Sequence, residues 1–172
     1  MMVRKEIKCR QAIQTDINVV TDLLFLLYND EGQAPDLTRK ELYVENEQLF
    51  ADNNQALFLA FDGDKAVGVS HGSLRREYVN GASDGVKGYL EAIYVLPDYR
   101  KNGVAADLAK ITEHWAAMNG CREMASDCLI ENIDSYKFHT KIGYEETERC
   151  IFFLKNIEPL NYEICQIDAP YP

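Results

Sequence analysis

The stretch YLEAIYVLPDYRKNGVA, residues 89–105, contains the change of structure on which the fold depends. Its first part, YLEAIYV (89–95), predicts a strand that stops before Pro97. After the polar YRKNG, apolar residues step by four and three, which predicts an amphipathic helix. These residues are Val104, Leu108, Ile111, Trp115 and Met118. The chain therefore passes from a strand to a long helix through a short glycine-containing loop.

The loop between this strand and helix has the features of a phosphate site. Gly103 can adopt backbone angles closed to other residues, and Ala105 leaves room beside the backbone. Amide N–H groups at a helix N-terminus attract anions, and Arg100 and Lys101 add positive charge. The alternative is a plain surface turn. The loop lacks GK[ST] and G-x-G-x-x-G, so neither a P-loop nor a nicotinamide site is indicated.

The remaining elements predict a mixed α/β (α+β) sheet with about four helices. Two apolar runs joined by Asp-Gly predict an antiparallel hairpin, whereas the later strands are separated by helices and should pair in parallel. A sheet that changes its pairing in this way can splay and open a cleft. The other expected strands are 7–13, 56–61, 66–74, 121–127 and 149–155, and the other helices are 17–28, 38–50 and 131–143.

The charge and residue composition of the chain limit the kinds of ligand or partner that it is expected to bind. The 172 residues include 28 acidic and 18 basic side chains, giving a net charge of −10. Nucleic acid is a poor partner for such a chain, whereas cationic small molecules or peptides are plausible ones. Five cysteines and three histidines show no metal-ligand spacing, so no metal is expected. No membrane span or secretory signal is visible, and the expected location is cytoplasmic.

R-x-x-G-x-A after a strand ending in V-x-P, in this order of elements, resembles the acetyl-CoA loop of GNAT N-acetyltransferases. The resemblance implies that loop amides bind the CoA pyrophosphate, with the backbone of Ile93 and Val95 near the pantetheine and thioester. The implied loop residues are Arg100, Lys101, Asn102, Gly103, Val104 and Ala105.

A closer resemblance, over roughly residues 70–155, is to the aminoglycoside 6′-N-acetyltransferases. It rests on REYVNG (76–81), YLEAIYVLP (89–97), GCREMASD (120–127), EN (131–132) and GYEETER (143–149). It implies transfer of acetyl from acetyl-CoA to the 6′-amine of an aminoglycoside, antibiotic resistance, and a homodimer. We expect one domain over 1–155 and a tail over 156–172 that extends a dimer interface or is disordered.

Within this resemblance, Glu91, Asp127 and Glu148 are expected to converge on one cleft and hold the ammonium groups of the substrate. Each could instead be an ordinary exposed carboxylate. Tyr78 is expected to stack on or hydrogen-bond a sugar, or else to pack locally. Tyr28, at the end of the first helix, is a weaker candidate for the cleft wall.

The reaction requires a neutral amine, so a carboxylate must accept a proton. Asp127 is the first choice for this base and Glu91 the second. The backbone N–H of Val95 would polarise the thioester oxygen. Direct attack needs no covalent enzyme intermediate, so Cys128 is not expected to be a nucleophile.

The second half of the site begins at Asn132, which the resemblance places against the pantetheine arm. The family often has a tyrosine seven residues later to protonate the departing thiolate, but this chain has His139 there and Tyr136 one turn earlier. An imidazole can be protonated near neutral pH and could serve as this acid. The alternatives are a packed helix residue at 139, Tyr136 as the acid, or no acid.

Two other functions remain open at this stage. The same fold could act on another amine, such as a polyamine or a protein N-terminus. A chain of this kind could also bind acyl-CoA as a sensor without turnover.

Overall fold

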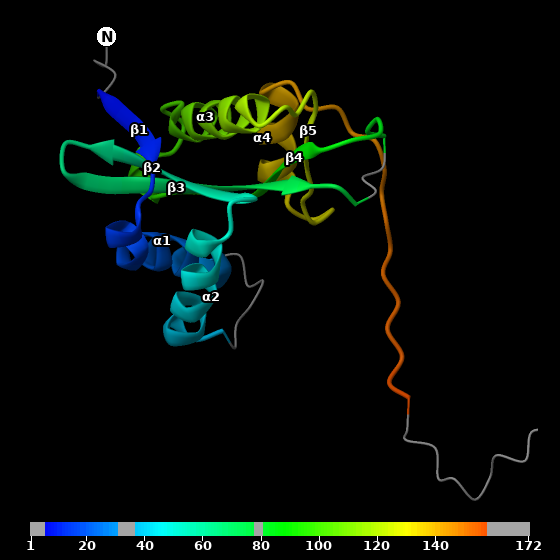
Figure 1. Cartoon of the computed structure of the whole chain (residues 1–172), viewed down its shortest axis with the longest axis horizontal. Coiled ribbons are helices and arrows are strands. Elements are labelled where there is room, and N and C mark those ends of the chain that lie inside the picture. The colour runs from blue at the N-terminus through cyan, green and yellow to red at the C-terminus, as the bar shows by residue number, and fades with distance from the viewer. Residues whose placement is uncertain (1–5, 31–36, 78–80, 158–172) are drawn as a thin grey trace, which may run out of the picture.

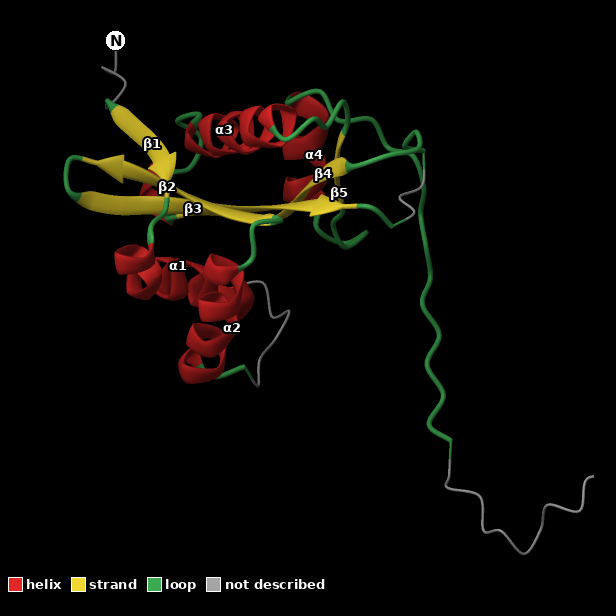
Figure 2. Cartoon of the chain, viewed as in Figure 1, coloured by secondary structure: helices red, strands yellow, loops and turns green. Residues whose placement is uncertain are grey.

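The alternation of apolar residues in the middle of the chain produces a five-stranded sheet. A computed structural model describes residues 6–30, 37–77 and 81–157. The strands lie in sequence order: β1 (Ile7–Gln11), β2 (Gln55–Asp62), β3 (Lys65–Arg75), β4 (Lys87–Val95) and β5 (Met124–Ser126). The first four strands pair antiparallel, and β5 pairs in parallel with β4. The predicted mixed sheet is therefore confirmed (Figure 2).

Helices cover both faces of this sheet. The helices α1 (Ile17–Asp30) and α2 (Arg39–Ala51) lie on one face, and α3 (Val104–Met118) and α4 (Ile133–Lys141) lie on the other (Figure 1). The predicted start of α2 is confirmed, because the Thr38 hydroxyl accepts from the Glu41 amide while the Glu41 carboxylate accepts from the Thr38 amide. None of the helices in the described ranges is long and apolar enough to cross a bilayer.

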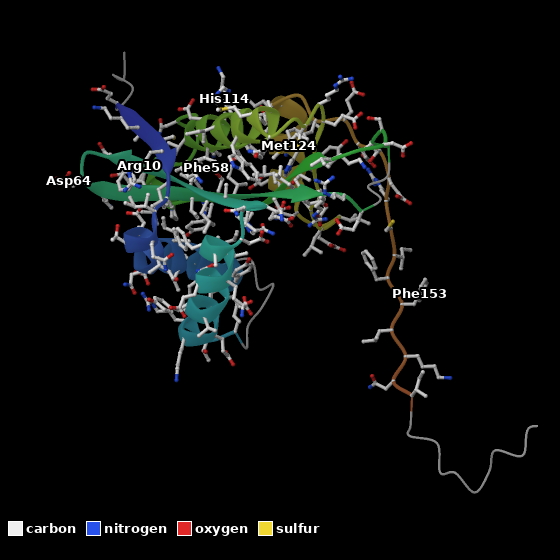
Figure 3. All side chains as sticks on the ribbon, viewed as in Figure 1. Arg10, Phe58, Asp64, His114, Met124 and Phe153 are labelled. Carbon is white, nitrogen blue, oxygen red and sulfur yellow. The ribbon has the colours of Figure 1, made fainter. Side chains whose placement is uncertain are left out.

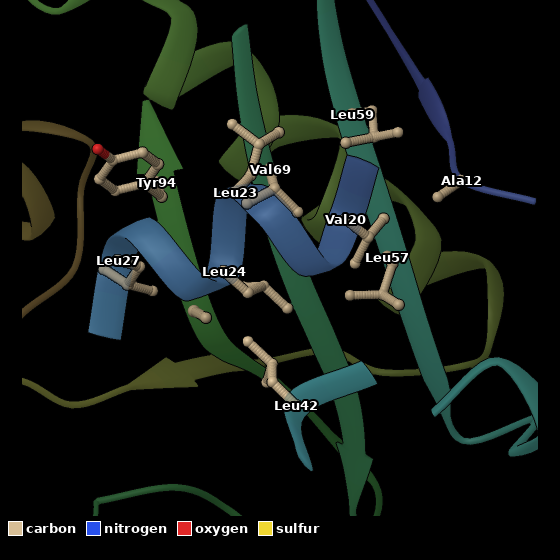
Figure 4. Packing of buried hydrophobic residues seen from close by; sticks show 11 residues of the cluster. Ala12, Val20, Leu23, Leu24, Leu27, Leu42, Leu57, Leu59, Val69 and Tyr94 are labelled. Atoms are coloured by element: carbon tan, nitrogen blue, oxygen red, sulfur yellow. The ribbon is translucent and has the colours of Figure 1, made fainter. Parts of the chain in front are cut away.

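The core divides into two layers because strand side chains alternate between faces. In β2, Leu57 and Leu59 pack under α1, whereas Phe58 and Ala60 pack under α3. Figure 4 shows the first layer, in which the apolar face of α1 meets the sheet and Leu42 of α2 closes one side. The core thus fixes α1 and α3 on opposite faces of β4, the strand that borders the candidate site.

The buried stripe of α3 differs from the predicted one at its C-terminal end. Thr112 and Ala116 are buried, whereas Met118 is 76% exposed. The reason lies in the sheet, where glycines let the helix approach closely. A Cβ on Gly72 would lie 2.4 Å from the Thr112 methyl, and one on Gly88 would lie 2.6 Å from the Ala116 Cβ. Small residues on α3 therefore face glycines on β3 and β4.

The predicted strand over 149–155 is wrong for the single chain. Residues 148–157 are exposed and make no strand, and Figure 1 shows them leaving the body of the molecule beyond α4. Phe153, labelled in Figure 3, is 93% exposed. Four successive apolar residues, Ile151–Leu154, need cover on both faces, and the described part of the chain supplies none. A β-forming composition is not enough for a strand, because a strand also requires a neighbour to pair with.

Candidate active site

The site begins where two strands of the sheet separate. Pairing between β4 and β5 covers Gly88–Leu90 opposite Met124–Ser126 and then ends. On its other side, β4 stays paired with β3 as far as Val95. The edge of β4 from Glu91 to Val95 therefore opens onto a gap, as predicted for a sheet that changes from antiparallel to parallel pairing.

The backbone of β4 presents hydrogen-bonding groups to this gap. The Leu96 amide donates to the Val67 carbonyl at 2.9 Å, which fixes the register of the antiparallel ladder. Residues alternate in such a ladder between those that bond the neighbouring strand and those that point away from it. By this alternation, Ile93 and Val95, opposite Ser70 and Gly68, direct their N–H and C=O groups away from β3.

The loop YRKNG follows directly and has the backbone expected of an anion site. Lys101 has φ 62° and Gly103 has φ 84°, so two left-handed residues turn the chain into α3. The first amides of α3 have no acceptor within the helix, and the helix dipole makes this end positive. The Arg100 guanidinium is anchored at the end of β4, where Nε donates to the Val95 carbonyl at 2.8 Å.

A cavity of about 370 Å³ lies at the separation of β4 and β5. It brings together four residues predicted from the sequence: Glu91, Ile93, Asp127 and His139. Other elements complete its wall, since α1 contributes Leu27, β4 contributes its central residues, and the segment after β5 contributes Cys128 and Leu129. Four titratable groups, Glu91, Asp127, Cys128 and His139, therefore share one cavity beside the exposed edge of β4.

Glu91 is fully engaged by neighbouring side chains. Arg75 binds both carboxylate oxygens, with Nε to Oε1 at 2.9 Å and Nη2 to Oε2 at 2.5 Å. The Ser73 hydroxyl also donates to Oε1. Glu91 lies in the predicted cleft, but the positive charge nearest to it belongs to the protein.

Asp127 has a different environment. It is exposed, and the Tyr89 hydroxyl donates to its Oδ1 at 2.6 Å. Burial of Tyr89, together with this hydrogen bond, raises the pKa of the phenol, so Tyr89 remains a donor at neutral pH. A carboxylate has about four acceptor positions, so Asp127 can accept further donors from the cavity.

His139 lies on α4, whose start is fixed by Asn132. The Asn132 side chain caps the helix by accepting from the Ser135 amide at 3.0 Å. One turn on, His139 Nδ1 lies 2.8 Å from the Ser135 carbonyl, and Nε2 lies 2.9 Å from the Ser126 hydroxyl. Tyr136, the alternative acid, is exposed, and the cavity wall in the described residues does not include it.

The other predicted substrate residues fall in different places. Tyr28 is half-buried, and burial and the carboxylates of Glu45 and Glu91 raise its pKa, but the cavity wall in the described residues includes its neighbour Leu27 and not Tyr28. Glu148 lies at the start of the projecting segment, and within the described residues the cavity wall does not include it. The predicted convergence of three carboxylates is thus not seen in one chain. Tyr78 lies outside the described residues.

Sequence reasoning missed the residues that hold the two carboxylates. Ser73, Arg75 and Tyr89 form this set, with Ser73 directly opposite Tyr89 in the ladder. The spacing of these residues is a signal that could have found them. Tyr89 and Glu91 are two residues apart on β4, and Ser73 and Arg75 are two apart on β3, so each pair lies on one face of its strand. A register shift hid it, because β4 has one extra residue, Glu91, opposite the step from His71 to Gly72, and this shift cannot be read from the sequence.

Comparisons with known proteins agree on one family. The family model for the acetyltransferase (GNAT) family matches residues 21–144. An aminoglycoside N(6′)-acetyltransferase type 1 of Acinetobacter haemolyticus is 40% identical over 114 residues, which are 66% of this chain and 79% of the relative. The Salmonella typhimurium LT2 enzyme of the same description is 41% identical over 112 residues, 65% and 77% of the two chains.

Solved structures agree in fold. Aminoglycoside N-acetyltransferase AAC(6′)-Iy in complex with CoA superimposes with a TM-score of 0.81 at 33% identity, covering 91% of this chain and 99% of that one. The same enzyme with a bisubstrate analogue, CoA-S-monomethyl-acetylneamine, gives a TM-score of 0.80 at 34% identity, covering 88% and 99%.

Proposed function

Because this chain belongs to the acetyltransferase (GNAT) family, we propose that it transfers the acetyl group of acetyl-CoA to the 6′-amine of aminoglycosides and so confers resistance to them. One observation carries the proposal: the exposed edge of β4 adjoins a cavity that contains Asp127. Acetyl-CoA bound along the edge of β4 would then lie next to an amine bound beside the Asp127 carboxylate. We also place the activity in the cytoplasm, where acetyl-CoA is available.

The residues at the start of α3 fit the phosphate end of acetyl-CoA. Two left-handed residues, Lys101 and Gly103, turn successive amides toward one side at a positive helix end. When bound, acetyl-CoA supplies the activated acetyl group. The backbone of Ile93 and Val95 would hold the extended arm of the molecule by strand-like hydrogen bonds, with the Asn132 side-chain amide on its other side.

Asp127 is the better candidate for the base. An ammonium group must lose a proton before its nitrogen can attack, and a carboxylate can take that proton directly or through a water. Glu91 is neutralised by Arg75, whereas Asp127 is exposed and hydrogen-bonded to a neutral phenol. Asp127 therefore attracts and deprotonates the amine, and Glu91 fixes the position of Arg75.

The chemistry proceeds by direct attack while both substrates are bound. The Val95 amide, which points away from β3, donates to the thioester oxygen as negative charge develops there. Cys128 lines the cavity but is not needed as a nucleophile. Ping-pong kinetics, which a covalent acetyl-enzyme produces, would contradict this step.

We further propose a homodimer formed through the projecting segment. Within the described residues, β5 is the last strand in the sheet, and a cavity of about 420 Å³ runs along it beside residues 142–147. The segment Ile151–Leu154 of a second copy has the β-forming residues to occupy this edge. The exchange would cover apolar side chains that one chain leaves exposed, and could bring Glu148 to a shared cleft.

The test compares CoA release from acetyl-CoA with an aminoglycoside bearing a 6′-amine and a close analogue bearing a 6′-hydroxyl. Release with the amine alone is the expected result. Equal release with both would move the acetylation to another position. Absence of release with either overturns the proposal, and polyamines and N-terminal peptides would then be tested as acceptors.

A further inference from the structure

The hydrogen bonds of His139 define which of its nitrogens carries a proton. A backbone carbonyl can accept but not donate, so Nδ1, 2.8 Å from the Ser135 carbonyl, must be the donor there. Nε2 lies 2.9 Å from the Ser126 hydroxyl, which can either donate or accept. Both ring nitrogens are therefore occupied by protein groups, and neither faces the cavity unpaired.

Ser126 lies at the point where β4 and β5 separate. Its register partner Leu90 is the last residue of β4 that pairs with β5, and the Ser126 hydroxyl lies 2.9 Å from the Leu90 carbonyl. The side chain thus bonds the strand at the place where the backbone ladder ends. Ser126 also lines the cavity that contains Asp127 and His139.

The Ser126 hydroxyl can hydrogen-bond Nε2 in both the charged and the neutral form of His139. When the imidazole is charged, Nε2–H donates to Ser126 Oγ, and Ser126 donates to the Leu90 carbonyl. When it is neutral, Ser126 turns its proton toward Nε2 and the Leu90 carbonyl loses that donor. A rotation of one O–H bond therefore accompanies the loss of the Nε2 proton.

We propose that Ser126 is the group that protonates the CoA thiolate, with His139 behind it as the source of the proton. This inference rests on the acetyl transfer proposed above. It differs from direct donation by His139, because the one nitrogen that could donate into the cavity is bonded to Ser126.

As the carbon–sulfur bond breaks, its electron pair goes to sulfur. The Ser126 O–H turns from the Leu90 carbonyl to the sulfur and gives it the hydroxyl proton. The serine oxygen takes the Nε2 proton, and the imidazolium becomes a neutral ring that keeps its Nδ1 proton. The amine has given one proton to Asp127, its second surplus proton passes to solvent water, and His139 is reprotonated from solvent after the products leave.

The groups around His139 hold it in this orientation. The Tyr144 ring packs edge-on against the imidazole, with centroids 5.4 Å apart, and Phe138 does so from the same helix at 5.3 Å. Asp127 and Glu91 are the charged groups that share its cavity. A ring packed between two aromatic side chains can exchange a proton without changing its position.

The first arm of the test uses the free enzyme and needs no substrate. Nitrogen-15 NMR of the histidine rings reports which nitrogen is protonated at each pH. Neutral His139 in the wild type is expected as the Nδ1–H form with Nε2 accepting a hydrogen bond. Ser126→Ala should shift the Nε2 resonance of His139, Ser126→Thr should restore it, and Thr140→Ala, on the same helix, should leave it unchanged.

The second arm measures kcat and KM at several pH values. Ser126→Ala and His139→Gln are each expected to lower kcat at least about tenfold, a modest acid effect because a thiolate leaves readily. The double variant should lose no more than either single one, since the two residues act as a unit. The KM for acetyl-CoA should change less than about twofold, and Thr140→Ala should keep wild-type kinetics.

The outcomes separate this inference from the proposed function. The proton transfer from His139 through Ser126 is overturned if the kcat losses of the two single variants multiply in the double variant. It is also overturned if the His139 resonance is unchanged in Ser126→Ala. A Ser126→Thr enzyme that folds and keeps the NMR signature but has the kcat of Ser126→Ala also overturns it. If wild-type enzyme acetylates no aminoglycoside, the proposed function fails, while the NMR arm still tests the Ser126–His139 pair.

Discussion

Arg75 and Tyr89 stack face to face, with the guanidinium carbon 3.4 Å from the centroid of the phenol ring. The same guanidinium binds Glu91, and the same phenol binds Asp127. One stacked pair therefore orients the two carboxylates of the cavity. It also makes them unequal, because Glu91 is bound by a cation whereas Asp127 is bound by a neutral phenol.

The first prediction follows from this inequality. Asp127→Asn should lower kcat by about 10²–10³-fold, because the amide cannot accept the proton of the amine. Since Asp127 is exposed, the variant should unfold at the wild-type temperature. Steady-state kinetics and thermal unfolding measure both. Glu131→Gln is the control, as it changes an exposed carboxylate in the same connection. Wild-type kcat in Asp127→Asn would remove Asp127 from the reaction.

Glu91→Gln should lower stability more than kcat, which is the reverse of Asp127→Asn. It breaks a half-buried ion pair that solvent partly screens, so we expect a loss of about 1–2 kcal/mol in the free energy of unfolding. The expected fall in kcat is less than about tenfold. Urea unfolding and kinetics of the same sample test this. A loss of kcat equal to that of Asp127→Asn would make Glu91 the base.

The third prediction concerns the loop before α3. Gly103→Ala places a side chain on a left-handed residue and should cost about 1–2 kcal/mol of stability. It should also raise the KM for acetyl-CoA more than the KM for the aminoglycoside, because the loop amides shift. Gly63→Ala is a matched control, since Gly63 is also left-handed and has open space around it. Equal effects of both variants on the KM for acetyl-CoA would argue against a phosphate site.

The fourth prediction concerns assembly. Wild-type protein should have twice the single-chain mass of 19.6 kDa in light scattering. Phe152→Asp should give monomers, because it places a charge in the proposed strand exchange. Met118→Asp, at an exposed apolar residue on α3, should leave the dimer intact. A dimeric Phe152→Asp protein would place the interface elsewhere.

The fifth prediction is a pH dependence of stability. Burial lowers the pKa of His71 below its ordinary value of 6.5, opposed by Glu91 and reinforced by Arg75. Below about pH 6.5 the unfolded chain binds a proton at His71 that the folded chain does not bind. The free energy of unfolding therefore falls as the pH drops below this value. His71→Gln should flatten this part of the profile in denaturant unfolding between pH 5 and 8. An unchanged slope would exclude His71 as the cause.

The fold was predictable wherever an element depends on contacts between residues that are close in sequence. The Asp-Gly hairpin, the capping box at Thr38 and the strand–loop–helix around Gly103 each depend on residues close in sequence. The segment 149–155 was predicted as a strand because its composition is β-forming. Whether a strand forms depends on a neighbour, which the sequence of one chain does not specify.

The residues that share the cavity were more predictable than the contacts they make. Glu91, Asp127 and His139 share one cavity, as the motifs suggested. The pairing of Arg75 with Glu91 depends on the register of β3 against β4, which a bulge shifts by one residue. Ser126 was missed because a serine in a short strand has no distinctive pattern. Its position at the end of the β4–β5 ladder is what gives it a role.

The position of the new acetyl group on the product tests the central claim most directly. Wild-type enzyme is incubated with acetyl-CoA and an aminoglycoside that carries a 6′-amine among several amines, and two-dimensional NMR of the product locates the amide. A single amide at the 6′-nitrogen is the expected result. An amide at any other nitrogen, or recovery of unmodified aminoglycoside, would contradict it.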